Sequence, residues 1–178
     1  VRPEAPFEHN ALPTNSPVTC GSGESKDLIF GHADGSLGSL DESVLETGSL
    51  ITSIASSTNG WISGHEDGSI SMKAVSEQLP GSIDAVGIVD SNGWASSFDG
   101  VKVLIMIIGE ESNNISHDSR IRKMDSSSNR IVLGDDLGRV YFVESEAMQR
   151  RINSHQEEPG GYTEKSDLRA RLRMLRNR

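Results

Sequence analysis

The stretch that decides the fold is DLIFGHADGSL at Asp27–Leu37, which returns as WISGHEDGSI at Trp61–Ile70. Each copy has a short apolar run, a turn built around Gly, and then an alternating run. Weaker copies follow at Trp94–Val101 and Ile131–Val140. The apolar runs begin at Leu28, Trp61, Trp94 and Ile131, which lie 33, 33 and 37 positions apart. A repeat of this length predicts a stacked or radial architecture, which presents surfaces more often than it builds a reaction centre.

The second repeat shows its strands most clearly. Ile51, Ser53 and Ala55 alternate with their neighbours, and Ser57–Gly60 contains the Asn-Gly pair of a tight hairpin. Val101–Ile108 is long and apolar enough to be buried on both faces. The expected strands are Val18–Cys20, Leu28–His32 and Ser36–Leu40; Ile51–Ala55, Trp61–His65, Ser69–Lys73 and a weaker Ala74–Leu79; Ile83–Val89, Trp94–Ser97 and Val101–Ile108; and, after a polar insertion at Gly109–Ser119, Ile121–Met124, Arg130–Gly134 and Arg139–Val143.

An apolar strand, an Asp-Gly turn and an alternating strand resemble the WD40 repeat, whose third strand typically ends in Trp-Asp. Leu40-Asp41 and Val143-Glu144 keep an apolar-acidic pair at that place without the Trp. Gly31-His32 and Gly64-His65 close the second strand, so they differ from the Gly-His pair that precedes the first strand in the family. The resemblance implies an all-β fold of about four degenerate β-propeller blades over residues 16–144. Since WD40 blades run ~40–45 residues, four shorter ones favour part of a larger ring, or a ring that a partner completes; a β-sandwich of hairpins is the rival fold.

Composition limits the function classes. The net charge is −9, and residues 1–143 carry 9 basic and 20 acidic groups, so the body is a poor binder of nucleic acid. Cys20 is the only cysteine, which excludes a disulfide framework and favours an intracellular location, nuclear or cytoplasmic. No stretch approaches the ~20 apolar residues of a membrane span, and no membrane partner is expected.

The candidate chemical groups have structural explanations. His32 and His65 fall at equivalent places on neighbouring repeats, about 10 Å apart, which is too far to share a metal ion; we expect each to bond its own hairpin. Four aspartates at the second hairpin are expected to cap turns through backbone amides, and Trp61 and Trp94 to lie in the core. We therefore expect no catalytic residues, no metal, no cofactor, no small-molecule substrate and no enzyme activity. The four aspartates are Asp34, Asp67, Asp99 and Asp136.

The ends of the chain differ from the repeats. Residues 1–15 are expected to be an extended lead-in, residues 145–162 a linker with a short helix at Glu144–Ile152, and residues 163–178 a basic amphipathic α-helix. The leucine and arginine stripes of this helix are the predicted partner-binding residues: Leu168, Arg169, Arg171, Leu172, Arg173, Leu175 and Arg176.

The sequence as a whole favours a non-catalytic protein–protein interaction scaffold, a subunit of a multi-protein complex whose partners are other protein subunits. The alternative is an RNA-associated factor, for instance in a ribonucleoprotein assembly such as that of ribosome biogenesis. In that case the basic tail would contact phosphate. An enzyme or a sugar-binding propeller is the third class.

Overall fold

A computed structural model describes residues 16–23, 28–39, 43–46, 48–58, 60–72, 75–109, 112–127, 129–148 and 150. These residues form four antiparallel sheets and one short helix at 145–148. The strands are β1 (Val18–Ser22), β2 (Ile29–His32), β3 (Ser36–Ser39), β4 (Ser43–Glu46), β5 (Ile51–Ser57), β6 (Gly60–His65), β7 (Ser69–Met72), β8 (Val75–Gln78), β9 (Ser82–Val89), β10 (Asn92–Phe98), β11 (Val103–Ile108), β12 (Asn113–His117), β13 (Ile121–Ser127), β14 (Arg130–Asp135) and β15 (Val140–Glu144).

Each sequence repeat folds into one sheet whose strands neighbour each other in chain order. The first three sheets are β1-β2-β3-β4, β5-β6-β7-β8 and β9-β10-β11-β12; in the part that the structure describes, the fourth has three strands, β13-β14-β15. The Asp-Gly turns allow these short connections, since Gly35 and Gly68 adopt φ values of +82° and +87°, which other residues rarely take. The all-β prediction and its four repeats are confirmed.

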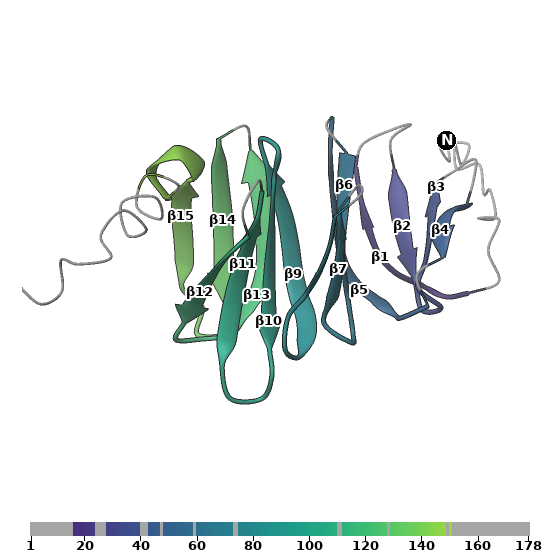
Figure 1. Ribbon diagram of the computed structural model, residues 1–178, viewed down its shortest axis with the longest axis horizontal. Helices are drawn as coiled ribbons and strands as arrows, with labels where there is room; N and C mark the ends of the chain where they lie inside the picture. Colours follow the sequence, from purple (N-terminus) through teal and green to yellow (C-terminus); the bar gives the residue numbers. More distant parts are fainter. Residues whose placement is uncertain are drawn as a thin grey trace, which may run out of the picture.

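The four sheets stand side by side in a row, as Figure 1 shows, from the purple first sheet to the green fourth sheet. Their first strands are neighbours, with β1 against β5, β5 against β9 and β9 against β13. Over the described residues the row does not close into a ring, so the first and fourth sheets lie at opposite ends (Figure 1).

The hydrophobic core consists of three clusters, one between each pair of successive sheets. Leu37, Ile51 and Ile54 lie between the first and second sheets. A second cluster around Ile70 and Ile83 joins the second and third sheets, and a third cluster joins the third and fourth sheets. Because a single small sheet cannot bury a face alone, each sheet depends on its neighbours.

Two strands were missed by the sequence analysis. β4 follows the first three strands, and β12 lies inside the segment 109–119 that was expected to be a polar insertion. β12 has the sequence NNISH, and its five residues alternate between half-buried and exposed. It is an edge strand that pairs only with β11, so it needs little apolar surface and gives a weak sequence pattern.

The predicted long strand at Val101–Ile108 begins two residues later. The backbone N–H groups of Val101 and Lys102 donate to Asp99 Oδ1 at 2.9 and 2.7 Å, which holds both residues in the turn. Val101 is consequently 85% exposed. From Val103 onward β11 is buried on both faces except for half-buried Leu104, as predicted.

The regular alternation expected for Ile51, Ser53 and Ala55 is wrong, because this strand contains a β-bulge. A β-bulge between Ile51 and Ser53 shifts the register of β5 against β6. Ile51 and Ile54 therefore lie on the same buried face, although their spacing of three residues would separate them in a regular strand.

Candidate functional site

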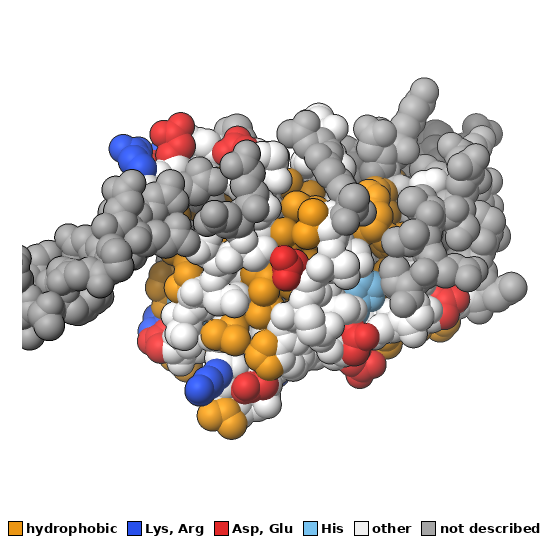
Figure 2. All heavy atoms as spheres, viewed as in Figure 1, with side chains coloured by type: hydrophobic (Ala, Val, Ile, Leu, Met, Phe, Trp, Pro, Cys, Tyr) orange, Lys and Arg blue, Asp and Glu red, His pale blue; other side chains and the backbone are white. Residues whose placement is uncertain are grey.

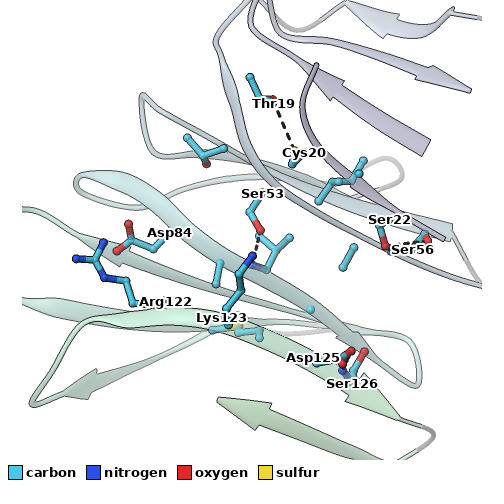
Figure 3. Close-up of a pocket in the computed structure, with 18 of the residues that line it drawn as sticks. Thr19, Cys20, Ser22, Ser53, Ser56, Asp84, Arg122, Lys123, Asp125 and Ser126 are labelled. Atoms are coloured by element: carbon cyan, nitrogen blue, oxygen red, sulfur yellow. Dashed lines mark hydrogen bonds between the residues drawn. The ribbon is translucent and has the colours of Figure 1, made fainter. Parts of the chain in front are cut away.

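A groove of about 570 Å³ runs across the first strands of all four sheets. Figure 3 shows the side chains that line it, from Thr19, Cys20 and Ser22 on β1 to Arg122 and Asp125 on β13. We call this the axial groove, because it follows the line along which the four sheets meet. Its volume falls in the range of ligand sites in proteins, but its lining is mainly hydroxyl, charged and peptide groups.

Two threonines at equivalent places in the groove tie successive sheets together. Thr19 Oγ1 donates to the carbonyl oxygen of Ile51 in the next sheet at 2.6 Å. Thr52 Oγ1 likewise donates to the carbonyl oxygen of Ile83 at 2.6 Å. A third link follows at the next place, where Arg120 Nε donates to Asp84 Oδ2 at 2.7 Å and forms an ion pair with it. These bonds hold the floor of the groove rigid.

The two cations of the groove have no such partners among the described residues. Arg122 and Lys123 are both exposed on β13, and Figure 3 shows them beside Asp84 and Ser53. Since Asp84 is paired with Arg120, its charge is already neutralised. Two exposed positive side chains in a groove rich in hydroxyl groups suit a polar ligand that carries a carboxylate or a phosphate.

The single cysteine also lines the groove. Burial raises the pKa of the Cys20 thiol, and a hydrogen bond from Thr19 only partly opposes this effect. A thiol with a raised pKa is a poor nucleophile, because the thiolate is the reactive form.

Three of the four aspartates predicted to cap turns do so. Asp34 Oδ1 accepts from the backbone N–H of Ser36 at 3.0 Å, and Asp67 Oδ1 accepts from that of Ser69 at 2.9 Å. Asp99 caps its turn through the two bonds described above. These bonds hold the pKa of each carboxyl below its usual value.

In the fourth repeat the prediction chose the wrong aspartate. Asp135, rather than Asp136, accepts the backbone N–H groups of Leu137 and Arg139, at 3.0 and 2.8 Å. Asp135 ends β14 at the place that His32 and His65 occupy in the first two sheets, so it combines the strand-end and turn-capping roles.

Asp135 is also the buried centre of an ionic cluster that the sequence did not indicate. Its Oδ2 accepts from Ser119 Oγ at 2.5 Å and from Arg139 Nε at 2.6 Å. Arg139 pairs in turn with Asp118, and its guanidinium lies over the ring of Tyr141. Burial by itself raises the pKa of Asp135, but these hydrogen bonds outweigh it and hold the pKa well below the usual range. Since every group has a partner, the cluster is a structural clamp.

The two histidines bond partly as predicted. His32 Nδ1 lies 3.3 Å from the carbonyl oxygen of Ser16, and His65 Nδ1 lies 3.1 Å from that of Ser49, so each ring braces the segment before the first strand of its sheet. His65 also bonds within its own hairpin, since its Nε2 lies 3.0 Å from Ser63 Oγ. Both side chains are buried, and over the described ranges no three His, Cys, Asp or Glu side chains gather as a metal site would require.

The tryptophans lie in the core as expected, to different degrees. Trp94 is 2% exposed and packs between the third and fourth sheets, whereas Trp61 is half-buried against the first cluster. Among the described residues no helix is long and apolar enough to cross a membrane.

The predicted partner-binding residues of the tail lie outside the described residues, as do residues 1–15 and most of the linker. Within the described part, charge is distributed unevenly. Figure 2 shows acidic side chains scattered across the viewed face, while basic ones appear only over the half that holds the third and fourth sheets.

Comparisons with known proteins address the fold alone. No protein-family model matches the chain, and no curated protein matches it. The chain is similar to the crystal structure of the computationally designed Ika4 protein, with a TM-score of 0.60 and 18% identity over 78% of this chain and 99% of that one. It is also similar to the computationally designed Ika8 protein, with a TM-score of 0.60 and 17% identity over 74% of this chain, but it spans only 47% of that one. The chain also matches a structure of the mitotic checkpoint complex with a TM-score of 0.43 and 10% identity, a likeness too weak to support any inference.

Proposed function

We propose that this chain is a WD40-like β-propeller module, or a sector of one, that acts as a non-catalytic scaffold for protein partners in a multi-subunit assembly inside the cell. The observation that carries the proposal is the axial groove with its two exposed cations. Antiparallel sheets that stand side by side, with their first strands along one groove, are the arrangement expected of a propeller sector. Such a body offers a rigid, preformed binding site at little entropic cost.

The ligand proposed for the groove is an extended protein segment that carries an acidic side chain. Arg122 and Lys123 supply the charge, and the hydroxyl groups of Ser126 and its neighbours supply adaptable hydrogen bonds. Between Ser22 and Ser56 the hydroxyl groups already bond each other at 3.1 Å, so the cationic end of the groove is the stronger recognition point.

The test places a photo-crosslinking amino acid at Ser126, in the groove, in the full chain expressed in cells. The matched control carries it at Val101, which is 85% exposed and does not line the groove. We expect protein adducts at Ser126 and few at Val101. Lys123→Gln should lower the adduct yield about tenfold, since a hydrogen bond to a charged group contributes about 1.5–3 kcal/mol.

Nuclease treatment separates the proposal from the RNA-associated alternative. Adducts that survive nuclease and vanish with protease support a protein ligand. Adducts at Ser126 that nuclease removes would point to RNA. Equal yields at Ser126 and Val101 would show that the groove selects no partner.

A further inference from the structure

The two ends of the row of sheets carry faces that are buried everywhere else in the molecule. Each inner sheet packs on both sides, toward the preceding sheet and toward the following one. Over the described ranges, no sheet follows the fourth and none precedes the first. The repeat makes it possible to compare each end face with its buried equivalents, position by position.

The face of the fourth sheet that would meet a following sheet carries an apolar area beside the exposed Arg130–Glu144 ion pair. We call this apolar area the C-terminal end face; it consists of half-buried Val132 and Gly134 and exposed Val140 and Phe142. Val140 pairs with Gly134 and is 57% exposed. Leu37 and Ile70, which pair with the corresponding glycines of β2 and β6, are 0% and 1% exposed.

Phe142 shows the same contrast more strongly. It occupies the same place in its sheet as Met72 in the second sheet and Ile107 in the third. Each of the three pairs with the residue of the neighbouring strand that lies two positions before the glycine of that strand, or before the residue that replaces this glycine. Met72 and Ile107 are 7% and 5% exposed, whereas Phe142 is 75% exposed. A Phe side chain left in water at a position that its repeats bury indicates a missing neighbour.

The first sheet carries the matching contact on its own outer face. Ile51, Ile83 and Ile121 lie first or second in the first strands of the inner and last sheets. Each pairs with the last or next-to-last residue of the second strand, and each is 0% exposed. Val18 holds the same place in β1, paired with His32, and is 47% exposed.

The buried copies show how the two end faces would fit. A side chain on Gly31 would lie 2.6 Å from Ile51 Cγ2, and one on Gly64 would lie less than 3.0 Å from Ile83 Cγ2. These glycines therefore leave the space that the isoleucine of the next sheet fills. A side chain on Gly134 would meet nothing within 4 Å, so the same space is present there and unfilled.

We propose that a second copy of this chain docks its first sheet on the C-terminal end face, with its Val18 side chain against Gly134. The contact would repeat the two internal ones, with Phe142 and Val140 covered by β1 and β2 of the second copy. Arg122 stands at the place of Thr19 and Thr52 and could donate to the Val18 carbonyl oxygen, as those threonines donate to Ile51 and Ile83. The inference concerns the end faces; of the residues of the axial groove it uses Arg122, but its test does not require that the groove bind a ligand.

Charge favours opposite ends meeting over like ends. Residues 16–48 carry six acidic groups and one basic group, a net charge of −5, so two first sheets would repel each other. Residues 118–144 carry five of each, a net charge of zero, and include the exposed cations of β13.

A head-to-tail contact either closes into a ring or propagates into a filament. We propose closure with two copies, which makes two equal interfaces.

The test begins with the mass of the full chain by light scattering, over about a hundredfold range of concentration. We expect a species of twice 19.2 kDa that does not grow further. A single chain throughout the range would overturn the proposal, and so would a mass that keeps rising, because that result indicates an open filament.

Two variants then separate head-to-tail docking from other pairings. Phe142→Asp and Val18→Asp each place a charge on one end face, and each should weaken the dimer about tenfold or more. Mixing them should restore a mixed dimer, because one of its two interfaces then joins two unaltered faces. If Val18→Asp left the dimer intact while Phe142→Asp broke it, the end face would be pairing with itself and head-to-tail docking would be wrong.

The control for both is Val101→Asp, an equally drastic change at a side chain that is 85% exposed on a turn of the third sheet. It should leave the mass unchanged. Far-UV circular dichroism of all three variants checks that each is folded, which we expect because the altered side chains are exposed in the single chain.

Discussion

Replacing Gly64 by Ala tests directly whether the sheets depend on glycine for their close approach. The new Cβ would lie less than 3.0 Å from Ile83 and 3.0 Å from Val86 Cγ1. Both neighbours are at least 98% buried, at 0% and 2% exposure, so neither can move into solvent. Overpacking of this kind costs about 1–3 kcal/mol. We therefore expect Gly64→Ala to lower the free energy of unfolding by about 2 kcal/mol.

The assay is urea unfolding followed by circular dichroism, at a concentration where light scattering gives the mass of one chain. With a denaturant dependence of about 2 kcal/mol per molar urea, the midpoint should fall by about 1 M. Gly134→Ala is the matched control, since it makes the same change at the same place of the repeat where nothing lies within 4 Å. Its free energy of unfolding should stay within about 0.5 kcal/mol of that of the parent. Equal midpoints for the two variants would refute the close-approach argument.

Three further predictions concern a hydrogen bond between two sheets, the carboxyl group of Asp135 and the C-terminal tail. Thr52→Val removes the hydroxyl group that bonds the Ile83 carbonyl oxygen and should lower the free energy of unfolding by about 1–2 kcal/mol in the same assay, whereas the exposed Thr58→Val should have no effect. The pKa of Asp135 in the folded state lies below its unfolded value of 3.8, so the stabilisation from its charge is present above about pH 4 and is lost as the pH falls. Asp135→Asn should therefore lower the free energy of unfolding at pH 7. The difference from the parent protein should be smaller when unfolding is measured at pH 3. Deleting residues 163–178 should leave the circular dichroism of the body unchanged while weakening partner association measured by co-purification; loss of the folded body would show that the tail is structural.

Much of the fold was predictable from local pattern, because hairpins are specified by neighbouring residues. The 33-residue period predicted the sheets, and the Asp-Gly turns predicted their connections. β12 escaped notice because an edge strand needs little apolar surface, and Asp135 was missed because two adjacent aspartates look equivalent in sequence. Arg139, which pairs with Asp135, has its second ionic partner Asp118 at a distance of 21 positions in the chain, a pairing that only folding brings about.

The sequence by itself determined most of the strands, how they pair within a sheet, and that about four such units follow one another. Only the tertiary structure decided which face of each sheet meets its neighbour. The physical reason is the β-bulge: a one-residue shift in β5 turns Ile54 to the face of Ile51, and equivalent shifts in the other first strands set the same pattern. With the faces assigned, Gly64 and Gly134 become two copies of one site, one filled by Ile83 and the other open.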